Sequence, residues 1–164
     1  MRTTVLLVAA LFAAAACSKE SSSNGEIAAP VSSSAARGPE HEFEWGPAPA
    51  VFPPGAEMAV LQGDPSTSNE FTVRLRLPNG YRIPPHTHPT IENVTVISGT
   101  FLAGMGAQFN EASMDRFGQG EFISIPNNHA HYAMARGQTI VQVHAMGPFA
   151  LTYVNPADLP HAAR

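Results

Sequence analysis

Turn-forming residues interrupt this chain at short intervals from Phe43 onward, and their spacing limits what it can fold into. The 164 residues include 15 prolines and 13 glycines. Many stand in pairs typical of turns, such as Asn79-Gly80, Ser98-Gly99 and Gly147-Pro148. The segments between the turns are too short for long helices. The sequence therefore predicts an all-β domain, either a sandwich or a barrel.

The segments between these turns have the residue pattern of β-strands. In residues 71–77, four apolar side chains alternate with Thr72, Arg74 and Arg76, so one face of the strand is apolar. Further strands are predicted at residues 58–62, 90–97, 121–125, 130–135, 140–146 and 149–154. A single short helix is predicted at the periphery, over residues 111–117, with Asn110 as its N-cap.

Charge and cysteine content exclude several classes of protein. The chain carries nine basic and thirteen acidic residues, a formal net charge of −4. A nucleic-acid-binding face needs clustered lysine and arginine, so nucleic acid is not expected as a partner. The single cysteine excludes an intramolecular disulfide and a cysteine-based zinc cluster.

The N-terminus has the pattern of an export signal. Arg2 precedes an unbroken run of twelve small or apolar residues, 5–16. A stable membrane span needs about 20 such residues, so residues 1–16 are predicted to be a signal peptide. The stretch Ala14-Ala15-Ala16-Cys17 resembles the lipobox of bacterial lipoproteins. This resemblance implies that Cys17 is lipidated and anchors an exported protein to a lipid bilayer of the cell envelope, on the periplasmic side or at the cell surface.

The segment after Cys17 has the composition of a flexible linker. Serine triplets occur at 21–23 and 32–34, and apolar residues show no periodicity. We therefore interpret residues 17–39 as the lipidated cysteine and its linker. We predict that residues 40–164 form a single domain, which is long enough to bury a core.

Two histidines and a glutamate share one face of an extended segment. His86 and His88 are two residues apart, and Glu92 follows four residues later. Because side chains alternate along a strand, even spacing directs all three the same way. Neutral imidazoles and a carboxylate that converge in this manner are typical ligands of a transition metal.

The spacing around these residues resembles that of the cupin family. The first cupin motif is matched completely, by Gly80, His86, His88, Glu92 and Gly99. The second is matched in part, by Gly120, Pro126 and His131, while Asn128 and Ala135 depart from it. The resemblance implies a double-stranded β-helix, or jelly-roll barrel, and it allows a homodimer. It also implies that one divalent metal is held by the residues His86, His88, Glu92 and His131.

Five further residues are candidates for a second shell or for contact with a substrate. His129 is two residues before His131, so in a strand both side chains would point to the same face. A solvated position in the turn is an equally good alternative. His144 and Gln142 lie on one face of their strand, which is either the interior of the barrel or its outer surface. Thr90 is expected near the metal. Arg82, in the approach to His86, is the one basic group expected at the mouth of the site.

Three imidazoles and one carboxylate suit Mn, Fe, Co, Ni, Cu or Zn and leave open positions on the metal. The alternation of side chains along the strands places Val73, Leu75, Val94 and Val96 inside the barrel, so a small-molecule ligand there is expected to be largely apolar.

Two functions are compatible with such a site. The first is a metal-dependent enzyme, dioxygenase-like or isomerase-like, that acts on a small organic substrate. The alternative is a non-catalytic envelope protein that binds a metal or a small ligand.

Overall fold

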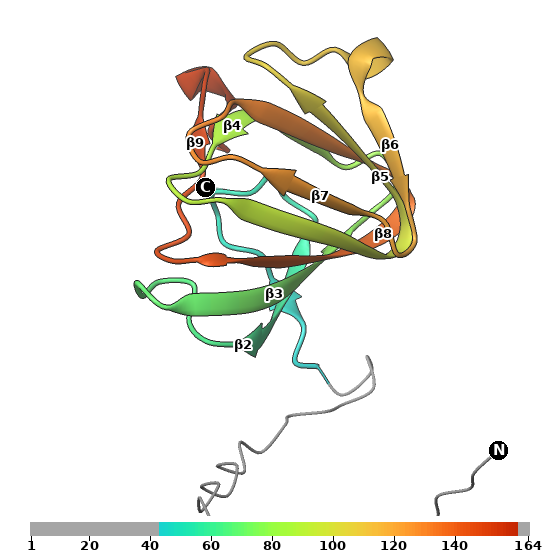
Figure 1. Cartoon of the computed structure of the whole chain (residues 1–164). Helices are drawn as coiled ribbons and strands as arrows, with labels where there is room; N and C mark the ends of the chain where they lie inside the picture. The colour runs from blue at the N-terminus through green and yellow to red at the C-terminus, as the bar shows by residue number, and fades with distance from the viewer. Residues whose placement is uncertain (1–42, 161–164) are drawn as a thin grey trace, which may run out of the picture. The chain divides into compact units, whose positions relative to one another are not determined.

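The computed structural model describes residues 43–160, which form one curled β-sheet (Figure 1). Its elements, in chain order, are β1 (Gly46–Pro47), β2 (Glu57–Gln62), β3 (Glu70–Leu77), β4 (Arg82–Thr87), β5 (Glu92–Met105), η2 (Glu111–Ser113), β6 (Asp115–Gly118), β7 (Phe122–Ile125), β8 (His131–Met146), β9 (Thr152–Tyr153) and η3 (Pro156–Asp158). The prediction of an all-β fold is confirmed. The predicted signal peptide, Cys17 and the linker to residue 39 lie outside the described residues. Within 43–160, no helix is long and apolar enough to cross a membrane.

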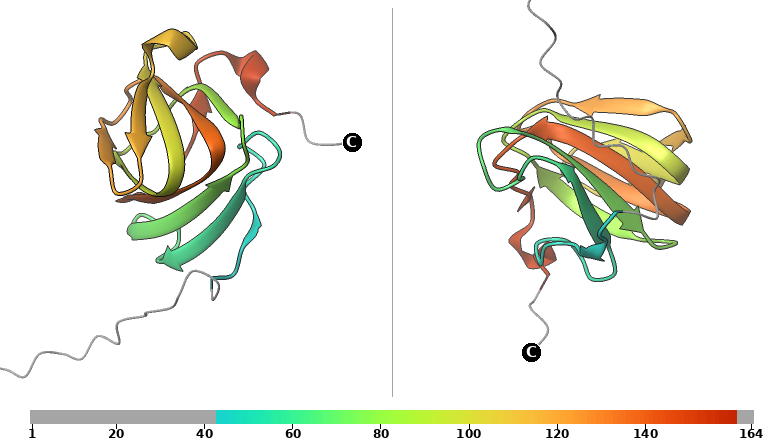
Figure 2. Two further views of the ribbon diagram at one scale, coloured as in Figure 1. Left: turned by 90° about the vertical axis from the view of Figure 1, so that its right-hand side faces the viewer. Right: turned by 90° about the horizontal axis from the view of Figure 1, so that it is seen from below.

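Strand β8 organises the sheet because it pairs along both of its edges. One edge pairs with β5 from end to end, and the other pairs first with β4 and then with β3. All of these pairings are antiparallel. One long strand thereby links two sets of shorter strands, and the sheet curls around an interior (Figure 2).

Two glycines permit the curl by bending the long strands. Gly99 in β5 has a φ of +83°, and Gly137 in β8 has a φ of +76°. The pairing register of β5 with β8 shifts on both sides of Ser98. A Cβ at Gly99 would lie 2.4 Å from the carbonyl oxygen of Gln138, so the two strands approach closely where they bend. This is the arrangement of a β-bulge.

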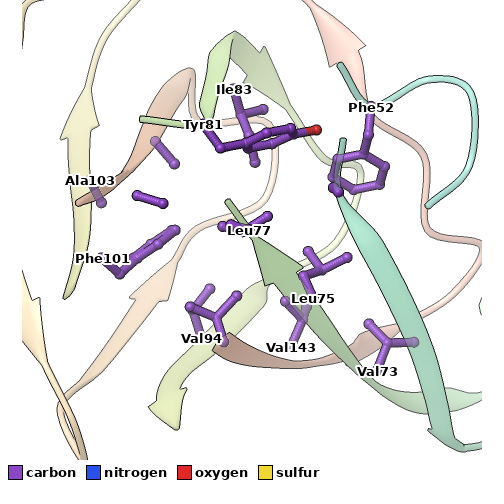
Figure 3. Packing of buried hydrophobic residues seen from close by; sticks show 14 of the residues in the cluster. Phe52, Val73, Leu75, Leu77, Tyr81, Ile83, Val94, Phe101, Ala103 and Val143 are labelled. Carbon is purple, nitrogen blue, oxygen red and sulfur yellow. The ribbon is translucent and has the colours of Figure 1, made fainter. Parts of the chain in front are cut away.

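The apolar faces of the strands fill the interior. In β3, the side chains of Phe71, Val73, Leu75 and Leu77 are all buried, as their alternation predicts. Residues of β5 and β8, including Val94 and Val143, pack against them (Figure 3). In β3, Arg74 and Arg76 alternate with these apolar residues and face the outside, because successive side chains point to opposite faces.

Several predicted boundaries differ from the structure. The predicted helix at 111–117 is a single 3₁₀ turn, Glu111–Ser113, capped by the Asn110 side chain. Strand β6 follows it because Asp115–Gly118 pairs with β5. The predicted turn at Ser98-Gly99 is a bend within β5, and the strands predicted at 130–135 and 140–146 are one strand. The last predicted strand, 149–154, is reduced to β9.

Candidate metal centre

Three histidine side chains meet in the interior of the curled sheet. One ring nitrogen of each of His86, His88 and His131 lies within 4.8 Å of those of the other two. All three residues are at most 3% exposed. Among residues 43–160, this is the only group of three or more histidine, cysteine, aspartate or glutamate side chains close enough to hold a metal ion.

Strand pairing explains why distant residues meet here. His86 in β4 lies directly opposite His131 in β8, and their ring centroids are 4.1 Å apart. His88 is two residues beyond His86, so it points to the same face. Glu92 begins β5, which is the other neighbour of β8. One carboxylate oxygen of Glu92 lies 3.3 Å from Nε2 of His131 and 3.6 Å from Nε2 of His88.

Backbone carbonyls fix the orientation of all three imidazoles. Nδ1 of His86 lies 2.7 Å from the carbonyl oxygen of Pro84, and Nδ1 of His88 lies 2.8 Å from that of Ala150. Nδ1 of His131 lies 3.0 Å from the carbonyl oxygen of His129. A carbonyl oxygen can only accept a hydrogen bond, so each Nδ1 must carry the proton. Each Nε2 is then left with a free electron pair.

The Nε2 atoms have no partner that matches this arrangement. Those of His88 and His131 are fully buried and make no hydrogen bond within the described chain. Buried polar atoms are rarely left unpaired, because the cost is about 1–3 kcal/mol each. In metal sites, a ligating histidine commonly donates its second N–H to a backbone carbonyl. Both the donor types and the orphaned atoms therefore fit one divalent transition metal.

Burial favours the neutral form of two imidazoles, those of His86 and His88. With smaller contributions from His131 and His88, burial lowers the pKa of His86 to about 3. Burial likewise lowers the pKa of His88. For Glu92, burial raises the pKa, but its contacts with His131 and His88 outweigh that effect and the pKa is lowered overall. These shifts favour neutral imidazoles at His86 and His88 and an ionised carboxylate at Glu92, which are the protonation states that metal binding requires.

The site opens onto a small apolar cavity. Its volume is about 20 Å³, and its wall consists of the four polar residues of the site together with apolar side chains from β3, β4, β5, β7 and β8 and from Phe52. A single water needs roughly 10–15 Å³ of such volume. Of the four valine and leucine residues predicted to line the pocket, Leu75 and Val94 do so. Val73 and Val96 are buried without reaching the cavity.

The outer face of β8 holds two of the residues predicted as substrate contacts. Val141 and Val143 face the cavity, so Gln142 and His144 point to the opposite side of the sheet. Gln142 accepts a hydrogen bond from Arg74, and Nδ1 of His144 lies 3.0 Å from the hydroxyl of Thr72. Of the two positions considered for these residues, the outer surface of the barrel is the one observed.

Three other predicted contacts also lie away from the cavity. Thr90 donates its hydroxyl to the carbonyl oxygen of Met146 and lines a separate outer groove. Arg82 is exposed and pairs with Glu111 at 3.1 Å, so it does not reach the interior. The side chain of His129 is exposed, and the residue takes part only through the backbone carbonyl that holds His131. For Thr90 and Arg82, a local partner directs the side chain away from the cavity. For His129, the solvated alternative is the one observed.

Two contacts from the C-terminal segment could not be found from the sequence. The ring of Phe149 stacks on that of His88, with centroids 4.4 Å apart and planes at 15°. The next residue, Ala150, supplies the carbonyl that orients the same imidazole. Residue 150 lies 62 positions from His88 in sequence, and a backbone carbonyl has no residue-type signature. Only the folded chain brings them together.

Comparisons with known proteins agree with this architecture. The sequence model of the ChrR cupin-like domain matches residues 35–150. No curated protein matches the chain significantly. Among solved structures, the polyketide cyclase RemF from Streptomyces resistomycificus has a TM-score of 0.60 at 20% identity, and the match covers 76% of this chain and 89% of RemF.

Two further structures have the same barrel. An RmlC-like cupin from Shewanella frigidimarina has a TM-score of 0.52 at 13% identity, with 66% of this chain and 87% of that one covered. KdgF from a Halomonas species has a TM-score of 0.51 at 17% identity, with 66% and 90% covered. At these identities the likeness establishes the fold alone, and the predicted cupin fold is confirmed.

Proposed function

The chain belongs to the ChrR cupin-like domain family, and from this premise we propose that it is a metal-binding cupin. His86, His88, Glu92 and His131 hold one divalent transition metal. The observation that carries the proposal is the set of three Nδ1 atoms aimed at backbone carbonyls. This arrangement directs three Nε2 electron pairs to one place, and no hydrogen bond uses those of His88 and His131.

Nitrogen and carboxylate ligands are compatible with Mn, Fe, Co, Ni, Cu or Zn. When bound, such an ion supplies Lewis acidity or a redox centre with exchangeable positions. The protein orients the ligands, since it fixes each imidazole by a hydrogen bond. It also surrounds the ligands with apolar side chains, which limits their contact with water. For a protein that acquires its metal outside the cytoplasm, intrinsic affinity favours Cu or Zn.

The reaction we propose is dioxygenase-like oxidation of a small, largely apolar organic molecule. The cavity beside the ligands has room for about one molecule of the size of water or dioxygen. Its wall is apolar apart from the ligands themselves, which suits an apolar substrate. The related fold of RemF, described as a polyketide cyclase, gives no preference, because one fold supports many reactions.

A non-catalytic metal- or ligand-binding role is the second candidate. Apart from the four ligands, no residue of the cavity wall can accept or donate a proton in its side chain. Reactions that need a separate general acid or base on the protein are therefore poorly supported. This feature favours either chemistry performed by the metal itself or simple binding.

We place the protein at the cell envelope, anchored through lipidated Cys17 with residues 17–39 as the linker. The support is the signal-like N-terminal sequence and the position of the only cysteine. Two acyl chains suffice for stable attachment to a bilayer.

The decisive experiment is metal analysis of protein purified from its native envelope, followed by oxygen-uptake assays with phenols, flavonoids and keto acids. About one equivalent of a transition metal, with oxygen consumption that depends on one of these substrates, supports the enzyme. Stoichiometric metal without turnover of any substrate supports the binding role. Protein that neither carries nor takes up a transition metal refutes the enzyme and the metal-binding role.

A further inference from the structure

One apolar residue of the cavity wall lies outside the strands of the curled sheet. Phe52 lies between β1 and β2, yet it is only 6% exposed and lines the same cavity as the histidines. Figure 3 shows Phe52 in the same apolar cluster as Leu75 of β3, Ile83 of β4 and Tyr81, which directly precedes β4. Every other lining residue belongs to a strand, apart from His88, which directly follows β4. Phe52 can therefore leave the cavity without disrupting the pairing of the sheet.

Two tyrosine hydroxyls hold the segment around Phe52 in place. Tyr81 donates to the carbonyl oxygen of Pro53 at 2.5 Å, and Tyr153 donates to that of Val51 at 2.8 Å. The two acceptors are the neighbours of Phe52 on either side. The segment has no strand ladder of its own. Apart from two local backbone hydrogen bonds, from Phe52 to Pro49 and from Ala48 to Ala56, these side-chain hydrogen bonds and the burial of the ring keep it in position.

The Phe52 ring occupies space that an organic ligand would need. With Phe52 in place, the cavity of about 20 Å³ admits a molecule the size of water, dioxygen or azide but not an aromatic ring. We propose that Phe52 determines which molecules reach the metal centre, by admitting small ligands and competing with aromatic ligands for the same apolar space. This inference rests on the proposed function, because it assumes a metal at the histidine cluster.

The competition has a measurable consequence. An aromatic ligand can bind only to the fraction of molecules in which Phe52 has moved away, so its apparent affinity is reduced by that fraction. Truncating Phe52 to alanine removes this penalty and leaves an empty apolar space. Apolar cavities of this kind in other proteins bind benzene. A small anion needs no such movement, so its affinity stays the same.

The test compares wild-type protein with Phe52→Ala, both loaded with Co²⁺, by titrating azide and phenol and following the Co²⁺ absorption bands. We expect phenol to bind Phe52→Ala about ten-fold or more tightly than wild type, and azide to change less than about three-fold. Val73→Ala is the control, because Val73 is buried in the core but does not line the cavity. It should leave both affinities unchanged.

A second readout needs no metal. Benzene should raise the melting temperature of metal-free Phe52→Ala and leave that of metal-free wild type unchanged. If Phe52→Ala fails to fold, Tyr153→Phe keeps the ring and removes one hydrogen bond. Loss of one hydrogen bond should improve phenol binding by about two- to ten-fold.

The outcomes separate the two proposals. Failure of the wild type to bind Co²⁺ would refute the metal site, while the benzene measurement would still test Phe52. If wild type binds Co²⁺ and phenol as tightly as Phe52→Ala and Tyr153→Phe do, the inference about Phe52 is wrong and the metal site stands. Gain of phenol binding in Val73→Ala as well would also overturn it, because general loosening of the core would then explain the effect.

Discussion

Removal of His131 should abolish the stabilisation of this protein by metal. His131 comes from β8, whereas His86 and His88 come from β4 and its end, so it is the ligand that links two distant parts of the chain. Its Nε2 is buried without a hydrogen bond, and its Nδ1 is directed at a carbonyl. The His131→Ala protein should keep the other ligands but bind metal much more weakly.

The size of the effect follows from mass action. At free metal roughly 100-fold above the dissociation constant, binding to the folded state adds about 2.7 kcal/mol to the free energy of unfolding. For a domain of this size, that corresponds to a rise of about 10 °C in melting temperature. The truncation also costs packing in the metal-free state. The informative quantity is therefore the difference between metal-loaded and metal-free protein of the same variant.

Differential scanning calorimetry with and without zinc measures this difference. His129→Ala is the matched control, since the side chain of His129 is exposed and only its backbone carbonyl contacts His131. Wild type and His129→Ala should show the full rise, and His131→Ala little or none. An undiminished rise and an unchanged metal stoichiometry in His131→Ala, with loss in His129→Ala, would refute the assignment.

Three further predictions concern pH, backbone and location. The pKa of His86 is lowered from 6.5 to about 3 in the folded state, so its contribution to the stability of metal-free protein should be present above pH 6.5 and smaller by about 1.4 kcal/mol one pH unit below it. The lowered pKa of His88 adds a loss in the same direction. Urea unfolding measures the change, and a flat profile would contradict the prediction. Gly99→Ala should destabilise more than Gly120→Ala, because both glycines have a φ of +83° but only at Gly99 would a Cβ meet the backbone; equal unfolding midpoints would show that the close approach is unimportant. Cys17→Ser should leave the protein soluble or uncleaved, and wild type that takes up no labelled fatty acid would exclude lipidation.

Sequence reasoning predicted the features that depend on local spacing. Alternation in residues 71–77 predicted the buried face of β3, and the even spacing of His86, His88 and Glu92 predicted that they face one way. It was less reliable for the lengths of strands. Gly99 was interpreted as part of a turn, yet it bends a continuous strand. Glycine permits a positive φ in both settings, so the residue type alone does not distinguish a turn from a bulge.

Contacts made across the fold could not be predicted from spacing. Phe52, Phe149 and the carbonyl of Ala150 reach the interior from segments outside the strands that carry the ligands. The alternation of side chains gives the relative orientation of residues within one strand, but it does not predict where a loop residue lies. Arg82 illustrates the reverse error, since proximity in sequence to His86 suggested the mouth of the site whereas its partner is Glu111.

The cost of burying unpaired polar groups explains which side chains lie in the interior and why the ligands are exceptions. In β8, the face with Val141 and Val143 is inside and the face with Gln142 and His144 is outside, because burying the apolar face is favourable and burying unpaired polar groups is costly. Only the four site residues break this rule among those that line the cavity. Three of them satisfy one ring nitrogen with a backbone carbonyl, and that leaves the second nitrogen and the Glu92 carboxylate to be compensated. A divalent cation compensates all of them at once, so an apolar interior that retains these four groups is best explained by metal binding.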